Sequence, residues 1–418
     1  MSRTSTPIAT FRALRHPNFR LYFIGMVFSL PGTWMQNVAQ SWLVYRLTNS
    51  EFLLGATWFA THMPVLLFGP IAGVAADRFC RRRIVLAMQV VAMLQALLLA
   101  YLTMAGTVTA YHVLALAAVL GTVNAFEIPA RQSLLVELAG KEDLLNAISL
   151  NSALFNMARI FGPSIAGLIV AGFGEGVCFL INALSFLAVI VSLAAMRLVR
   201  AARETGETVM ARLVEGFRFA WQERPVRVLL VMCAAMNLAG TPGMVLAPFV
   251  ADGIFGRGSV GLGLLMTAMG LGAMTGTLVL ARRTGTDGLP RTILHSGLLM
   301  GVSLAVFAWS PSFYLSLAVI PLVGFGVFRQ SASVNTLVQT MIPDSHRGRI
   351  MAIYSMMALG FLPLGSLASG ALARLIGVRW TIFAGAALCL AAAALYRTAL
   401  PSLERWRSIE EKHEVSTV

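Results

Sequence analysis

Long runs of uncharged, apolar residues constrain this chain more than any other feature of its sequence. A helix needs roughly 20 such residues to cross the hydrocarbon core of a bilayer, and runs of this length do not suit the surface of a soluble protein. The composition agrees, because 57% of the residues are hydrophobic and only 12% are charged. We therefore expect an all-α integral membrane protein.

Twelve runs are long enough to span a membrane, six on each side of one polar segment. The first six are expected at Leu21–Tyr45, Phe52–Ala76, Ile84–Ala105, Tyr111–Val136, Leu144–Ala171 and Val177–Met196. The second six are expected at Val228–Val250, Val260–Leu280, Ile293–Trp309, Phe313–Met341, Ile350–Ala373 and Trp380–Leu395.

The spacing of these runs divides the chain into five segments. They are a cytoplasmic N-terminal segment at 1–20, a six-helix bundle at 21–196, an amphipathic cytoplasmic linker at 197–227, a second six-helix bundle at 228–399 and a cytoplasmic tail at 400–418. A shift of the sequence by 203 residues places Gly73 on Gly276, Gly121 on Gly324, Gly162 on Gly365 and Gly167 on Gly370. These matches predict that the two bundles are pseudo-repeats.

The net charge of +14 does not indicate a nucleic-acid partner, because the basic residues occupy short loops between apolar runs. Such loops face the cytoplasm. If both termini are cytoplasmic, the basic residues on the other side are only Arg46, Arg257, Arg374 and Arg379 of 32. We expect a multi-pass protein of the bacterial inner membrane, a monomer that contacts the lipid bilayer, protons and a small-molecule substrate.

The sequence contains no pattern that indicates an enzyme active site. The four cysteines lie far apart without disulfide or metal spacing, and the chain has no His-Glu-x-x-His run, no Gly-x-Ser-x-Gly elbow and no nucleotide-binding loop. We expect neither a cofactor nor a metal. A channel is disfavoured, because two six-helix halves joined by a linker suit alternating access. A nontransporting membrane receptor remains an alternative.

The loop after the second run carries an acid one helical turn after a glycine, which a merely basic cytoplasmic turn would not explain. It reads Gly73-Val74-Ala75-Ala76-Asp77-Arg78-Phe79-Cys80-Arg81-Arg82-Arg83. This arrangement closely resembles the signature of the major facilitator superfamily, except that Cys80 replaces the usual glycine. The resemblance implies that Gly73 lets two helices approach, and that Asp77, Arg78 and Arg82 lock the outward-facing state.

Two further patterns narrow the resemblance. Gly162, Pro163 and Gly167 resemble the fifth-helix signature of antiporters in this superfamily, which implies export. The runs Pro129-Ala130-Arg131-Gln132 and Asn335-Thr336-Leu337-Val338-Gln339, the second continuing to Arg347-Gly348-Arg349, resemble the branch that contains the enterobactin exporter and related secretion carriers.

Three ionisable residues lie deep in predicted spans, where a charge costs roughly 2.5 to 3.5 kcal/mol unless it faces a cavity or a partner. They are Glu127, Arg159 and Arg329. Glu127 and Arg159 are each 16 residues from Asp143 in the expected turn, so they are expected at similar depth and to form a salt bridge. Glu127, the only acid deep in a span, is expected to couple transport to protons. The family resemblance implies that Glu127 and Arg329 face a central cavity.

Amide side chains in the spans are candidates for the substrate pocket, because they supply hydrogen-bonding groups inside the bilayer. The candidates are Gln36, Asn37, Gln40, Asn124, Asn237 and Gln330. Two intramembrane arginines against one glutamate favour an anionic or amphipathic solute such as a siderophore. We therefore expect a proton-coupled exporter, with multidrug efflux or lysophospholipid transport as alternatives.

Overall fold

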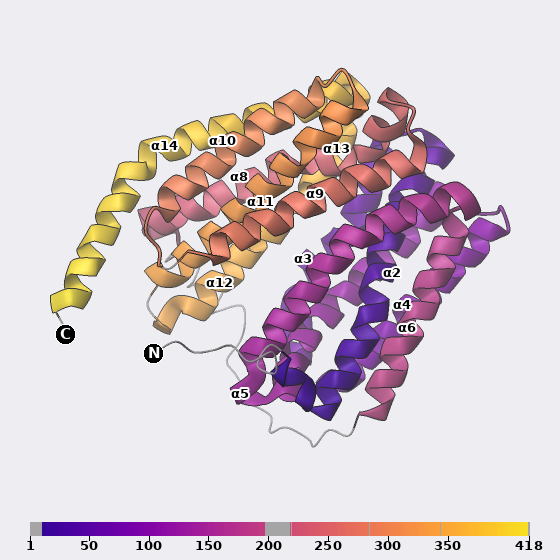
Figure 1. The fold of residues 1–418 in the computed structure, drawn as a ribbon, viewed down its shortest axis with the longest axis horizontal. Coiled ribbons are helices and arrows are strands. Elements are labelled where there is room, and N and C mark those ends of the chain that lie inside the picture. Colours follow the sequence, from indigo (N-terminus) through magenta and orange to yellow (C-terminus); the bar gives the residue numbers. More distant parts are fainter. Residues whose placement is uncertain (1–10, 197–217, 219, 284, 343, 417–418) are drawn as a thin grey trace. The chain divides into compact units, whose positions relative to one another are not determined.

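The computed structural model describes residues 11–196, 218, 220–283, 285–342 and 344–416, and helices account for nearly all of this part of the chain (Figure 1). The first half contains η1 (Arg12–Arg15), α2 (Pro17–Thr48), α3 (Glu51–Arg78), α4 (Arg81–Met104), α5 (Ala110–Phe173) and α6 (Glu175–Ala195). The second half contains α8 (Arg224–Val245), η2 (Phe249–Ile254), α9 (Gly258–Ala281), α10 (Leu289–Ala308), α11 (Phe313–Met341), α12 (Asp344–Leu359), α13 (Phe361–Ile376) and α14 (Val378–Ser416).

The described residues form eleven helical stretches that are long and apolar enough to cross a membrane. Helix α2, 32 residues long and covering the first predicted span, brings the number to twelve. The predicted all-α membrane fold of twelve spans is thus confirmed. The expected amphipathic linker falls mostly on residues 197–217 and 219, which are outside the described part of the chain.

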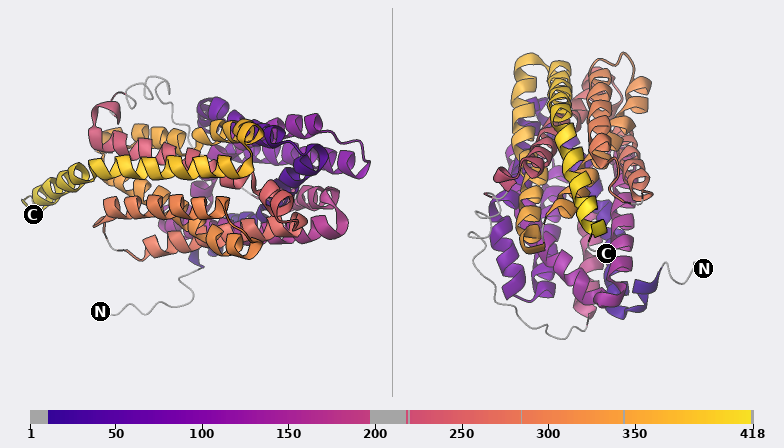
Figure 2. Two further views of the ribbon diagram at one scale, coloured as in Figure 1. Left: turned by 90° about the horizontal axis from the view of Figure 1, so that it is seen from above. Right: turned by 90° about the vertical axis from the view of Figure 1, so that its left-hand side faces the viewer.

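Three predicted boundaries differ from the structure. Helix α5 combines two spans, its first arm (Ala110–Gly140) and its second arm (Glu142–Phe173), which meet at a kink where Gly140 adopts a φ of 67°. The eleventh span is divided between α12 and α13 at Gly360. Helix α14 continues through the predicted tail to Ser416, as its long yellow ribbon shows (Figure 2).

The chain forms two compact units that do not coincide fully with the two halves of the sequence. Unit 1 comprises residues 1–49, 60–206 and 257–267, and unit 2 comprises residues 50–59, 207–256 and 268–418. Unit 1 therefore includes the first turns of α9, and unit 2 includes the first turns of α3. The two exchanged segments occupy similar places in the repeat, since each begins the second helix of its half.

The glycines matched by the repeat make equivalent contacts within the units. A β-carbon on Gly162 would collide with Trp34 of α2, and one on Gly365 would collide with Thr241 of α8. Gly167 lies against Gly263 at the start of α9, and Gly370 lies against Gly55 at the start of α3.

Helices in lipid approach closely where their residues are small. Equivalent glycines thus contact equivalent helices, as expected of pseudo-repeated bundles. Gly73 is an exception, because no atom of the described residues outside its own stretch of helix lies within 4 Å of the position that its β-carbon would occupy.

The short helix η1 is fastened to the beginning of the second arm of α5 in unit 1. The side chain of Asn146 accepts a hydrogen bond from the backbone N–H of Ala13 at 2.9 Å. Asp143 pairs with Arg12 at 2.8 Å and with the ring of His16 at 3.0 Å. Ala13 itself is buried in the apolar core that α2 and α5 share. This packing places the start of α2 beside the kink of α5.

Candidate functional site

A buried ion pair of unit 1 joins Glu127 and Arg131 on the first arm of α5. The Arg131 Nε lies 2.9 Å from the Glu127 Oε1. The side chain of Arg131 is only 16% exposed and that of Glu127 only 9%. They are four residues apart, so they occupy one face of the helix, with the acid on the favourable N-terminal side. The buried phenol of Tyr22, from α2, lies beside this pair.

The predicted salt bridge between Glu127 and Arg159 is wrong, because the structure pairs Glu127 with Arg131. The chain turns at Gly140 rather than near Asp143, so Glu127 lies 13 residues before the kink and Arg159 lies 19 residues after it. This difference of six residues corresponds to about 9 Å of helix. The Arg159 guanidinium instead donates a hydrogen bond to Asn156 at 2.6 Å, one turn earlier on the same helix.

The amide side chains predicted on the first span differ in burial and in hydrogen bonding. Gln36 is buried in a network in which it donates to Gln95 at 3.0 Å and accepts from Asn182 at 2.6 Å. This amide therefore joins α2 to α4 and α6. Gln40 is also buried, but its Oε1 has no hydrogen-bond donor among the described residues. Asn37 and Asn124 are half-buried.

In unit 2, Arg329 lies near the middle of α11 and has no acidic partner among the described residues. Its Nε is buried without a hydrogen bond, and its guanidinium carbon lies 5.4 Å from the ring centre of Phe325. A cation above an aromatic face gains only part of the interaction free energy that an ion pair would provide. The adjacent Gln330 is buried, and its Nε2 likewise finds no acceptor in the described part of the chain.

Asn237 belongs to a polar contact that the sequence does not predict. Its amide nitrogen donates to the Cys233 backbone oxygen at 2.9 Å, one turn earlier on α8. Tyr354 of α12 donates to the Ser331 backbone oxygen of α11 at 3.0 Å and lies beside the Cys233 thiol. Tyr354 is separated from Cys233 by more than 100 residues in sequence, so no local pattern indicates that these two side chains are neighbours.

The first residues of α4 contact two neighbouring helices. Arg82 donates to the backbone oxygens of Leu193 and Ala194, at 2.6 and 2.9 Å, and so satisfies carbonyl groups at the end of α6. Arg81 forms an ion pair with Glu137 of α5. Arg78 is exposed, and the side chain of Asp77 lies outside the described part of the structure. The gating roles assigned to these residues remain predictions.

The Gly162, Pro163 and Gly167 pattern is a helix-packing site. The Gly167 backbone oxygen accepts from the Ser259 hydroxyl at 3.1 Å, and the Thr267 hydroxyl donates to the Ile160 backbone oxygen at 2.8 Å. The hydroxyl of Ser164 lies 2.6 Å from that of Thr267. The pattern therefore joins α5 to the first turns of α9 through both close packing and hydrogen bonds.

A family model described as "Transmembrane secretion effector" matches residues 8–416 of the chain. The chain is 30% identical to the multidrug efflux pump Tap of Mycolicibacterium fortuitum, over 83% of this chain and 87% of that protein. It is 28% identical to the staphyloferrin A transporter of Staphylococcus aureus, with 85% and 90% covered. The enterobactin exporter EntS of Shigella boydii is 23% identical, with 81% of each chain covered.

Solved structures show the same fold. A mutant form of the nucleoside transporter NupG matches with a TM-score of 0.72 at 13% identity, over 91% of this chain and 99% of that one. A bacterial homologue of the iron transporter ferroportin, solved in its inward-facing state, matches with a TM-score of 0.70 at 18% identity, over 92% and 98%.

Proposed function

The chain belongs to the transmembrane secretion effector family of the major facilitator superfamily, and from this membership we propose that it exports an anionic, siderophore-like solute in exchange for protons. Its family and relatives are membrane transporters rather than enzymes. The proposal concerns the charge of the solute, the direction of transport and the coupling ion.

Arg329 is the observation that carries the choice of an anion. Its guanidinium lies near the middle of a span without an acidic partner among the described residues, whereas Glu127 is already neutralised by Arg131. An unbalanced charge at this depth is costly. A carboxylate or phenolate of the solute would balance it.

Export is supported by the relatives and by the sequence. One relative is named as a multidrug efflux pump and another as an enterobactin exporter. The Gly162, Pro163 and Gly167 pattern, which resembles the antiporter signature, lies in a close helix contact. Multidrug efflux is the second candidate, favoured by the 30% identity to the pump of M. fortuitum.

Proton coupling is assigned to Glu127, which can exchange its partner for a proton. While it is ionised, it pairs with Arg131. When it is protonated, the guanidinium of Arg131 is released and can attract an anion instead. Competition between a carboxylate and the solute for one cation would couple opposed fluxes without requiring both to bind at once.

Transport in everted membrane vesicles from an overexpressing strain tests this function. Staphyloferrin A and enterobactin would serve as anionic solutes and ethidium as a cationic drug. We expect saturable uptake of a siderophore, driven by a pH gradient. Arg329→Gln should reduce it by about tenfold or more, as expected for loss of a charge-assisted hydrogen bond. Arg329→Lys should retain part of it.

Arg291→Gln is the matched control, because Arg291 is an exposed arginine whose partner is Glu404 at the surface. It should transport like the wild type. Transport of ethidium but of neither siderophore, unaffected by Arg329→Gln, would favour the multidrug candidate and remove the anion proposal. Absence of gradient-driven flux for all three solutes would support a nontransporting receptor.

A further inference from the structure

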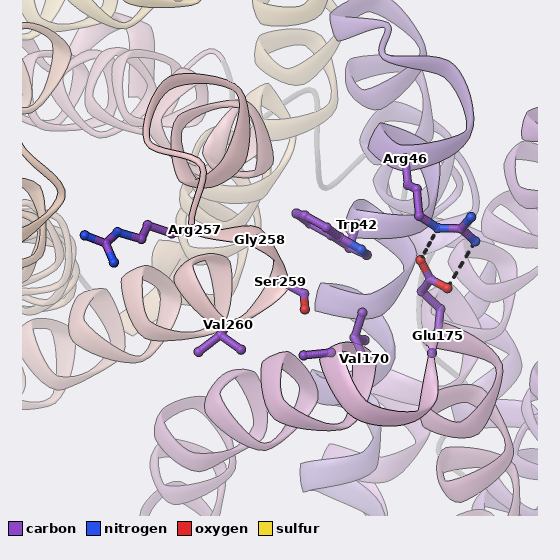
Figure 3. A pocket seen from close by; sticks show the side chains of 10 residues that line it. Trp42, Arg46, Val170, Glu175, Arg257, Gly258, Ser259 and Val260 are labelled. Carbon is purple, nitrogen blue, oxygen red and sulfur yellow. Dashed lines mark hydrogen bonds and ion pairs between the residues drawn. The ribbon is translucent and has the colours of Figure 1, made fainter.

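Unit 1 contains a cavity of about 520 Å³ at the end of the bundle where α2 and α5 terminate (Figure 3). Its wall is formed by the last turns of α2, the corner between α5 and α6, and residues 257–260 at the start of α9. By the predicted topology this end faces away from the cytoplasm. The volume is in the range of small-molecule sites. The residues that line it do not include any of those predicted for the substrate pocket.

The polar centre of the cavity is a bidentate ion pair between Arg46 and Glu175. The Arg46 Nε donates to one carboxylate oxygen at 2.7 Å and the Nη2 donates to the other at 3.2 Å. The Glu175 side chain is only 6% exposed, but that of Arg46 is 52% exposed. The carboxylate is therefore a buried anchor, and the guanidinium it holds faces solvent.

The Arg46 guanidinium is held in place and still has N–H donors that Glu175 does not use. A guanidinium has five N–H donors, and Glu175 accepts from two of them. Carboxylates bind arginine through pairs of such donors. Since the buried carboxylate already fixes the orientation of Arg46, little conformational freedom is lost when an anion binds.

The remaining wall favours a solute with a flat apolar part. In Figure 3 the indole of Trp42 lies between the ion pair and the start of α9, and Val170 and Val260 also line the cavity. A ring can stack on an indole while its acidic substituent reaches Arg46. Arg257 also lines the cavity, with its side chain pointing away from the ion pair in Figure 3.

We infer that this cavity is a second, outer binding site for an aromatic or amphipathic anion, with Arg46 as its anchor and Trp42 as its stacking surface. It extends the proposed export function and in that respect rests on it, since an anion released at this end would meet it. Binding here requires neither Arg329 nor proton coupling, so the site can be tested separately from transport.

Equilibrium dialysis of the full-length protein in nanodiscs tests the inference, with empty nanodiscs as the blank. The probes are 2-naphthoate and its cationic analogue 2-naphthylmethylammonium, which share one ring system. We expect 2-naphthoate to bind more tightly than the cation. Arg46→Gln should weaken its binding about tenfold, in line with loss of a charged hydrogen bond, and Trp42→Ala should weaken it several-fold.

Glu175→Gln should strengthen anion binding, because it removes the carboxylate that competes for Arg46. Arg46→Gln leaves a buried carboxylate unpaired and can therefore unfold, so the double variant Arg46→Gln/Glu175→Gln is the informative one. This variant removes both charges of the ion pair and should fold without binding 2-naphthoate. Arg379→Gln is the control, because it alters another arginine predicted on the outer side, one that donates to the Ser310 backbone oxygen in unit 2.

Unchanged 2-naphthoate binding by the double variant would overturn the inference. So would a preference for the cation that Glu175→Gln abolishes, since this would make the carboxylate the ligand group. Arg329→Gln should leave 2-naphthoate binding unchanged. If Arg329→Gln abolishes siderophore transport but not this binding, the two sites are distinct. If transport of anions fails altogether while binding persists, the proposed function is wrong and the outer site stands.

Discussion

At the scale of single residues, the charges inside the spans differ in how fully they are compensated. Glu127 has a cation one helical turn away, and the pair is largely shielded from solvent. Arg329 has an aromatic ring and a buried amide neighbour but no acid in the described chain. A charge inside a span needs a partner or a water-filled cavity. We therefore propose different tasks for the two residues, exchange of a proton for Glu127 and attraction of an anion for Arg329.

The proposed role of Glu127 leads to the first prediction at this scale. Glu127→Gln should abolish accumulation driven by a pH gradient and leave downhill exchange of the solute measurable, since a glutamine cannot take up a proton. Gradient-driven uptake and counterflow in everted vesicles would measure the two separately. Glu142→Gln is a suitable control, because the side chain of Glu142 is 90% exposed at the kink of α5.

A purely structural pair would behave differently. Breaking a buried ion pair typically costs about 3 to 5 kcal/mol of stability, so the variant would then be poorly expressed or would unfold at a lower temperature. If Glu127→Gln still concentrates the solute with unchanged pH dependence, the coupling role has to be abandoned.

At the scale of elements, glycine contacts determine how closely the helices approach. Helix α5 illustrates this, because Gly162 faces α2 and Gly167 faces the first turns of α9, while Gly172 faces open space in the described structure. The contact at Gly167 also carries the hydrogen bond from Ser259. Helix α5 therefore contains one glycine at which a larger side chain should be disruptive, Gly167, and one at which it should not, Gly172, five residues apart.

A second prediction concerns this pair of positions. A β-carbon on Gly167 would lie 2.7 Å from the Ser259 backbone oxygen, so Gly167→Ala should lower stability by about 1 to 3 kcal/mol, as overpacking does. Gly172→Ala should be neutral or stabilise by up to about 1 kcal/mol, since alanine is the better helix former. Thermal unfolding in detergent would measure both. Equal unfolding temperatures for the two variants would contradict the α5–α9 contact.

At the scale of the whole molecule, the distribution of basic residues remains the basis for orientation. The structure gives the order and bounds of the spans, but it does not indicate which end of the helices faces the cytoplasm. The excess of Lys and Arg in alternate loops indicates this orientation. From it we expect both termini, and the start of α4 with Arg81 and Arg82, to lie in the cytoplasm.

Cysteine labelling in intact cells tests this topology. In a background that lacks the exposed Cys80 thiol, cysteines introduced at Ser2 and Thr417 should resist an impermeant thiol reagent until the cells are lysed. A cysteine at Thr107 should react before lysis, since this exposed residue follows α4 on the opposite side. Labelling of either terminal cysteine before lysis would overturn the orientation.

Much of this protein was determined by the sequence alone, because the properties concerned belong to single segments. Hydropathy and length define the twelve spans, and the motifs around Gly73 and Gly162 were sufficient to indicate the superfamily. The ion pair of Glu127 and Arg131 also had a local signal, their spacing of four residues, although the predicted partner was Arg159.

Other features were decided only by the tertiary structure. The kink at Gly140 set the relative depth of the two arms of α5, and a shift of one residue turns a helical side chain by about 100°. Sequence position therefore did not reveal that Gln36 is tied into a network while the Gln40 oxygen has no donor among the described residues. The outer cavity combines residues from α2, α5, α6 and α9, and only folding brings such distant segments together.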